Sequence, residues 1–246
     1  MRSFEDIPYG RGGKLDLWLP DTEAFDVFLY FHGGGLEKGA KSNARRYVPF
    51  LPDRGVCVVS ADYRMYPEAR YPDFIEDAAE AVAWVKGHIG EYGSCRRLFV
   101  GGSSAGAYLS MMLCFDGRYL AKHSLSPDDI DGFIHNAGQP TAHFRVLRER
   151  GLDKRRLIVD ETAPLYYVGT AETYPPMLFL VADGDMKNRY EQTMLMVSTL
   201  RHFGHEEPRV RLRVIEGTTH CSYNKPTREG EPAPFARLVY DYIQSI

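Results

Sequence analysis

The sequence predicts one α/β domain over residues 1–246, with a mostly parallel sheet and helices on both faces. Apolar runs of strand length alternate along the chain with longer segments whose apolar residues recur at helical spacing. Such alternation is typical of parallel sheets, because the crossovers between parallel strands are usually helices. A chain of 246 residues can bury one large core, and no repeat or linker-like segment divides it.

The first half of the chain contains the more regular elements. Strands are expected at residues 14–19, 26–31, 56–61 and 97–100. The first alternates polar and apolar residues, as a half-buried strand does, and the others are nearly continuous apolar runs, as central parallel strands are. Helices are expected from Asp73 to Gly90, where apolar residues form one stripe, and over residues 105–115.

The second half begins with a strand over residues 130–138, followed by a less regular segment, 139–174, which we expect to form a short lid. A strand at 177–181, a helix at about 189–203 and a helix at about 234–243 come after it. Arg209–Ile215 alternates basic and apolar residues, which suits an edge strand. An edge strand can also pair across a homodimer, so the sequence leaves the oligomeric state open.

Composition excludes several classes of partner. The formal net charge is −3, which gives no support for nucleic acid or an anionic membrane as a partner. The basic segment Arg145–Arg156 contains acidic residues, so we interpret it as a solvated helix face. No apolar run is long enough to span a membrane, and the four cysteines lack metal-ligand spacing, so we expect reduced thiols and a cytoplasmic protein.

Residues 98–106, Leu-Phe-Val-Gly-Gly-Ser-Ser-Ala-Gly, contain the frame Gly102-x-Ser104-x-Gly106 between an apolar run and a helix-like segment. This frame fits a nucleophile elbow, a tight strand-to-helix turn that exposes a serine hydroxyl. Larger side chains at the two glycine positions would collide with the neighbouring strand and helix. Ser103 fits less well, because alanine stands two residues after it.

A second motif, His32-Gly33-Gly34-Gly35, directly follows the apolar strand at 26–31. Glycines let the backbone turn sharply and offer bare N–H groups to a ligand. A phosphate-binding loop is excluded because no Gly-Lys-Ser/Thr follows. The position upstream of an elbow favours a loop that stabilises an oxyanion.

A base and a carboxylate follow later strands. A serine hydroxyl is a weak nucleophile and needs an adjacent base, which His220 can supply after the last strand. A carboxylate that orients the histidine is available at Asp183 or Asp185, and periodicity does not choose between them. The order serine, aspartate, histidine is the order found in one large class of hydrolases.

Together these pieces resemble the α/β-hydrolase superfamily and, within it, the hormone-sensitive-lipase-like carboxylesterases of the acetyl esterase type. The resemblance rests on His32–Gly35, Asp62-Tyr63-Arg64 with Pro67-Glu68, Gly102–Gly106, Pro175-Pro176 and His220. It implies that Asp185, nine residues past Pro176, is the acid. It also implies an oxyanion hole made by the backbone N–H groups of Gly34, Gly35 and Ala105, and no metal or cofactor.

Two departures from the family pattern stand out. The first strand is expected near Lys14, without the long preceding cap of many relatives, so residues 139–174 would be the only lid. Tyr66 also stands where the family usually has a small residue.

The sequence therefore predicts a serine hydrolase that cleaves a small carboxylic ester with a short acyl group through an acyl-enzyme. The catalytic residues would be Ser104, His220 and Asp185. An arylformamidase-like amide hydrolase with the same triad is one alternative. A non-catalytic binding protein of the same fold is the other.

Overall fold

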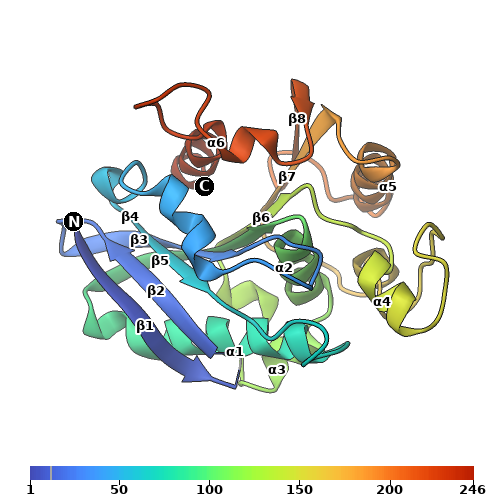
Figure 1. The fold of residues 1–246 in the computed structure, drawn as a ribbon, viewed down its shortest axis with the longest axis horizontal. Coiled ribbons are helices and arrows are strands. Elements are labelled where there is room, and N and C mark those ends of the chain that lie inside the picture. The colour runs from blue at the N-terminus through green and yellow to red at the C-terminus, as the bar shows by residue number, and fades with distance from the viewer. Residues whose placement is uncertain (12) are drawn as a thin grey trace.

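An eight-stranded sheet forms the centre of the computed structural model, which describes residues 1–11 and 13–246 (Figure 1). Its strand order is β1-β2-β4-β3-β5-β6-β7-β8. The strands are β1 (Arg2–Gly10), β2 (Gly13–Leu19), β3 (Ala24–Phe31), β4 (Val56–Ala61), β5 (Ser94–Ser103), β6 (Gly132–Asn136), β7 (Met177–Gly184) and β8 (Val210–Thr219). Two pairs of neighbouring strands, β1 with β2 and β2 with β4, are antiparallel. All the other neighbouring pairs in this order are parallel. The predicted mostly parallel α/β sheet is confirmed.

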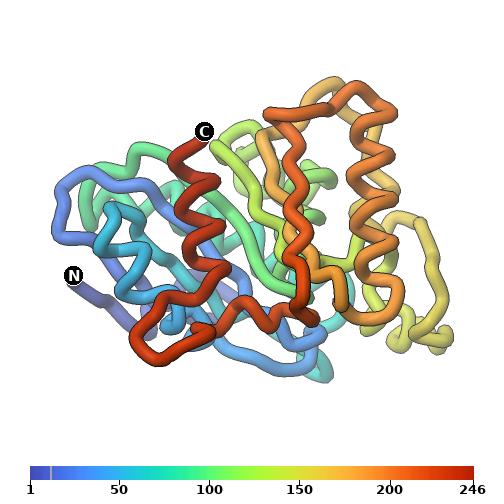
Figure 2. Tube along the Cα trace, turned by 90° about the horizontal axis from the view of Figure 1, so that it is seen from above, coloured from blue at the N-terminus to red at the C-terminus, as the bar shows by residue number. Residues whose placement is uncertain are grey.

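Helices cover both faces of this sheet. They are α1 (Asp73–His88), α2 (Ala105–Phe115), α3 (Arg118–Ala121), α4 (Phe144–Glu149), α5 (Arg189–His202) and α6 (Pro234–Gln244). One face packs against α1, α2 and α5 in a single apolar cluster. The other face packs against α6 and the 3₁₀ segment Lys41–Tyr47. In Figure 2, α6 (dark red) and α5 (orange) lie on either side of β8.

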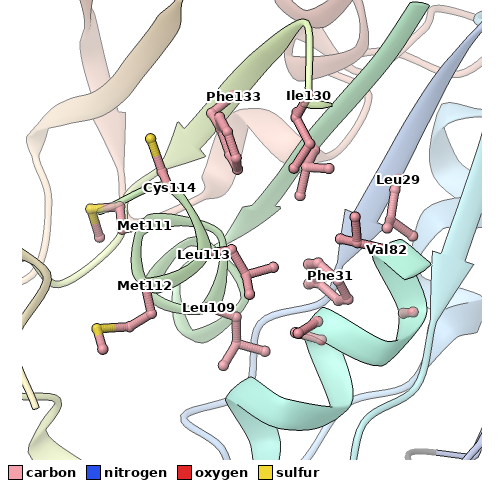
Figure 3. Packing of buried hydrophobic residues seen from close by; sticks show 14 of the residues in the cluster. Leu29, Phe31, Val82, Leu109, Met111, Met112, Leu113, Cys114, Ile130 and Phe133 are labelled. Carbon is pink, nitrogen blue, oxygen red and sulfur yellow. The ribbon is translucent and has the colours of Figure 1, made fainter. Parts of the chain in front are cut away.

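The core explains why the central elements form where they do. Successive residues of β3 point to opposite faces, so Leu29 and Phe31 join one cluster while Phe28 joins the other. In Figure 3, Leu109 of α2 and Val82 of α1 approach Leu29 and Phe31 beneath the sheet. Every residue of α2 is buried, which explains its apolar sequence without a polar face.

The expectation that the first strand starts near Lys14 is wrong, because β1 precedes it over Arg2–Gly10. Most of its residues are exposed, and two irregularities interrupt its pairing with β2. An exposed, bulged edge strand buries no regular alternation of residues, so it leaves little periodic signal.

Segment 139–174 contains α4 and the 3₁₀ turn Pro164–Tyr167. The interpretation of Arg145–Arg156 as one solvated helix face is wrong, because α4 ends at Glu149 and Arg145 is buried. Arg145 forms an ion pair with Glu37, and its guanidinium lies 3.6 Å from the centre of the Tyr66 ring. Figures 1 and 2 show the stretch around residues 150–160 (yellow) projecting from the body near α5.

Candidate active site

Parallel register brings the ends of the central strands to one edge of the sheet. Phe31 of β3 pairs with Gly102 of β5, and Ser103 of β5 pairs with Asn136 of β6. The motifs that follow these strands therefore lie together, as is usual at the carboxyl edge of α/β sheets.

Ser104 stands between β5 and α2 in a backbone conformation that L-residues rarely adopt, with φ 56° and ψ −111°. The turn is held by the bond from the Ser104 N–H to the Asn136 carbonyl, 2.8 Å. A side chain at Gly106 would clash with the carbonyl of Phe31, so this position requires glycine. The local structure is the strained elbow that the frame of glycines predicts.

The imidazole of His220 lies between Ser104 and Asp185. The His220 Nε2 is 2.9 Å from the Ser104 Oγ, and the His220 Nδ1 is 2.6 Å from the Asp185 Oδ1. Because a carboxylate only accepts, the Nδ1 carries the proton and donates it, which leaves the Nε2 free to accept from the serine hydroxyl. The Asp185 side chain is fully buried, and its Oδ1 also accepts from the Met186 N–H.

The two candidate carboxylates occupy different positions, although they are two residues apart. Asp183 is exposed and accepts hydrogen bonds from the N–H groups of Gly217 and Thr218, at 2.9 and 3.2 Å. These bonds hold the pKa of Asp183 below its ordinary value. Asp183 thus joins the ends of β7 and β8, and it is Asp185 that contacts the imidazole.

The glycine loop lies beside the elbow. A Cβ placed on Gly33 would approach the Ser104 Cβ to 3.2 Å, and Gly34 adopts φ 130°. In the part of the chain that the structure describes, the N–H groups of Gly34 and Gly35 donate to no protein acceptor. Ala105 begins α2, where first-turn N–H groups have no partner within the helix. All three N–H groups are therefore free to bind an anionic oxygen.

Buried contacts hold the glycine loop from below. The Tyr63 hydroxyl donates to the His32 carbonyl, and the His32 Nδ1 lies 2.8 Å from the Gly33 carbonyl oxygen. Burial lowers the pKa of His32, so its ring is neutral and stacks on Tyr63 at 4.4 Å. His32, the first residue of the loop, is therefore held in place by Tyr63 and in turn contacts Gly33.

A buried polar network, which the sequence patterns do not predict, lies under the elbow. The Ser103 Oγ accepts from the side-chain amides of Asn136 and Asn224, each at 2.9 Å. The Asn136 amide also donates to the Asn224 carbonyl oxygen at 2.8 Å, and the Asn136 Oδ1 accepts from the Tyr223 hydroxyl. The network links the elbow to the segment after His220. Its only signal in the sequence is a polar residue that closes the apolar strand at Asn136.

A cavity of about 550 Å³ opens above Ser104. Its lining includes Gly33, Gly34 and Gly35 of the glycine loop, His220 and Cys221, and Phe144 of α4. Burial raises the pKa of the Cys221 thiol to about 12, so the thiol stays protonated at neutral pH and does not compete as a nucleophile. Phe144 was not predicted as a site residue, because only the tertiary fold brings α4 to the cleft.

The arrangement contains a hydroxyl paired with a neutral imidazole, a carboxylate behind the imidazole, and free N–H groups nearby. These are the functional groups that nucleophilic attack on a carbonyl group requires. Within residues 1–11 and 13–246, no cluster of three histidine, cysteine or acidic side chains is arranged to hold a metal. None of the described helices is both long and apolar enough to cross a bilayer.

Known proteins that resemble this chain include a family and several curated relatives. A family model described as the alpha/beta hydrolase fold matches residues 28–224. LipM of Mycobacterium tuberculosis, named a probable carboxylic ester hydrolase, is 37% identical over 110 residues, which are 42% of this chain. LipI of the same organism, named an esterase, is 36% identical over 121 residues, which are 46% of this chain. The chain spans 26% and 37% of the length of these two curated relatives.

Among solved structures, a thermophilic esterase of Thermogutta terrifontis with bound propionate superposes with a TM-score of 0.76. The match covers 99% of this chain and 93% of the other, at 20% sequence identity. This likeness shows a shared fold over the whole length of the chain.

Proposed function

The chain belongs to the α/β hydrolase family, and from that premise we propose that it is a serine carboxylesterase. Its substrate would be a small ester with a short acyl group. The observation that carries the proposal is the unbroken contact from the Ser104 hydroxyl through His220 to Asp185. The names of the relatives as esterases support the same reaction class.

Acylation would begin when the Ser104 Oγ attacks the ester carbonyl carbon and its proton passes to the His220 Nε2. The carbonyl oxygen becomes an oxyanion beside the N–H groups of Gly34, Gly35 and Ala105. Each such donor is worth about 3 kcal/mol in the transition state. The C–O bond to the alcohol then breaks, and the alcohol leaves with the proton from His220.

Deacylation would reverse these roles. A water molecule gives a proton to the His220 Nε2, and its oxygen attacks the acyl carbon. The carboxylic acid leaves, and the proton returns to the Ser104 Oγ. Asp185 keeps the Nδ1–H oriented throughout and stabilises the imidazolium that forms in each half of the reaction.

The surroundings of the serine support a short acyl group. Charged and amide side chains line part of the cavity, among them Asn43, Arg46 and Lys225. A long acyl chain gains affinity only where it removes its methylene groups from water against apolar surface. Here the charged groups interrupt the apolar surface that Phe144 and Met186 supply, so we expect a short acyl group to fit best.

The test is hydrolysis of 4-nitrophenyl esters from acetate to laurate by the wild type and by Ser104→Ala. We expect hydrolysis of acetate and butyrate, a decline toward laurate, and a loss of about 10⁴-fold or more in kcat in the variant. Equal rates in both proteins would reject Ser104 as the nucleophile.

One further substrate and one covalent inhibitor separate the proposal from its rivals. Faster turnover of an aryl formamide than of any ester would reassign the protein to amide hydrolysis. Labelling of Ser104 by a fluorophosphonate is expected. Its absence, together with absence of all hydrolysis, would favour a binding protein with this fold.

A further inference from the structure

A second cavity of about 420 Å³ lies beside the catalytic cleft, between the stretch after α4 and the N-terminus of α5. Five cationic side chains line it, and no carboxylate does. They are Lys154, Arg155, Arg156, Lys187 and Arg189. This concentration of positive charge contrasts with the formal charge of −3 of the whole chain.

Arg189 lines this cavity with a guanidinium group that is held in a fixed position. Its side chain is buried, and its guanidinium donates to the Ala137 carbonyl at 2.6 Å and to the Gln139 Oε1 at 3.3 Å. Both acceptors are neutral, and none of the described carboxylates forms an ion pair with Arg189. The Asp185 carboxylate acts on Arg189 through space without contacting it, so an anionic ligand in the cavity would add to the compensation of this buried charge.

The acidic groups near the cavity offset only part of its positive charge. Asp153 pairs with Arg155, and the Asp185 carboxylate, which accepts from the neutral His220, offsets part of the charge of Arg189. Glu191 lies in the first turn of α5 and is exposed. Among the described residues, Lys154, Arg156 and Lys187 form no ion pair, so their charges are available to a ligand.

The basic cavity adjoins the catalytic cleft through two apolar side chains. Phe144 and Met186 line both cavities. Phe144 approaches the glycine loop, since a Cβ on Gly35 would lie 3.0 Å from its ring. Met186 directly follows the Asp185 that contacts His220. An extended ligand can therefore have one end at Ser104, an apolar middle against Phe144 and Met186, and its other end among the cations.

We propose that the ester substrate carries an oxyanion group, a carboxylate or a phosphate, which binds in this basic cavity while its ester bond lies at Ser104. The proposal rests on the esterase function proposed above and names the class of its substrate. Guanidinium and ammonium groups bind such oxygens by charge-assisted hydrogen bonds. The N-terminus of the 14-residue helix α5 adds to the attraction for negative charge.

The test compares esters that differ only in charge at the end remote from the ester bond. Mono-4-nitrophenyl adipate against its methyl ester places the charge on the acyl side. 4-Acetoxybenzoate against its methyl ester places it on the alcohol side, and 4-acetoxyphenyl phosphate replaces that carboxylate by phosphate. We expect kcat/KM at low salt to be about tenfold higher for at least one anionic ester than for its neutral counterpart.

The double variant Arg156→Gln/Lys187→Gln changes only exposed side chains. We expect it to reduce the ratio of anionic to neutral kcat/KM to about two or below. The ratio is the readout because a general loss of active protein cancels from it. Arg201→Gln is the matched control, an exposed arginine at the opposite end of α5, and should keep the wild-type ratio.

The outcomes separate the two proposals. Hydrolysis that depends on Ser104 but shows no preference for any anionic ester would overturn the anionic-substrate proposal alone. So would a preference that survives in the double variant. Absence of Ser104-dependent hydrolysis for every ester would reject the esterase function, and the substrate class with it.

Discussion

The two sides of the catalytic cleft are held by different forces. On the elbow side, Ser103 and Asn136 belong to a buried network in which neutral polar groups satisfy one another. On the lid side, α4 is joined to the chain just after the glycine loop by the ion pair between Arg145 and Glu37. The stretch after α4 carries exposed cations.

This difference separates two requirements of one site. The reacting atoms must keep their geometry, and buried neutral hydrogen bonds fix geometry at any ionic strength. Recognition of a charged group needs charges that water and salt can reach, and such interactions weaken as salt rises. The elbow side is therefore expected to determine stability and kcat, and the lid side to determine the choice of substrate.

The sharpest test of the elbow side uses the two neighbouring aspartates. Asp185→Asn should lower kcat by about four orders of magnitude, because an amide no longer holds the His220 tautomer. Asp183→Asn should lower kcat by less than tenfold, since Asp183 contacts only backbone N–H groups. Ester hydrolysis by both variants, with circular dichroism as the folding control, checks this. Similar losses in the two variants would contradict the assignment.

The paired serines separate geometry from chemistry. Ser103→Ala leaves the amides of Asn136 and Asn224 without their shared acceptor and should lower the free energy of unfolding by about 3 kcal/mol. Ser104→Ala should change it by less than about 1 kcal/mol while abolishing hydrolysis. Urea unfolding measures the first effect and ester hydrolysis the second. If the Ser103→Ala protein were as stable as the wild type, the buried network on the elbow side would not be the source of stability that we expect.

Buried histidine gives the elbow side a characteristic response to pH. Burial lowers the pKa of His135 to about 3, and its Nδ1 lies 2.9 Å from the Ser110 hydroxyl oxygen. As pH falls below about 6.5, the unfolded chain binds a proton that the folded protein excludes, so stability present above 6.5 is progressively lost toward pH 3.

We expect His135 to contribute a loss of about 1.5 kcal/mol in the free energy of unfolding between pH 6.5 and 5. Urea titrations of His135→Gln at both pH values should show a smaller loss than the wild type. The exposed His202→Gln serves as the control and should retain the full loss. An identical loss in His135→Gln would refute the contribution.

The smallest effect is expected on the lid side. Glu37→Gln removes the charge that pairs with Arg145 and should lower kcat/KM by about threefold at low salt, because it loosens the glycine loop. The deficit should vanish near 1 M salt, where the pair is screened in the wild type as well. Glu68→Gln, another exposed acid, should match the wild type under both conditions. A deficit that persists at high salt would show that the charge is not its cause.

The sequence predicts the elbow side better than the lid side, for a physical reason. Each central strand buries apolar residues on both faces. At position 106 only glycine avoids a clash with the backbone of Phe31. Such constraints are local, so they leave local patterns. The strand β1 is missed because its exposed residues carry no regular pattern.

The basic cavity is missed because its walls come from two separate segments. Arg156 and Arg189 meet only in the tertiary fold, and each reads in the sequence as an ordinary surface charge. The network of Asn136 and Asn224 is hidden for the same reason, since 88 residues separate its two amides.

The bonds from Asp183 to Gly217 and Thr218 have a mechanical consequence. They fasten the end of β7 to the end of β8, directly before His220, so the imidazole and its carboxylate follow two strands that are tied together, while Ser104 follows β5. The strand β8 is the last in the sheet and has a neighbour on one side only. On warming, fraying of this border would carry the base away from the nucleophile with its aspartate still attached. The enzyme would then lose its catalytic activity while its core remained folded.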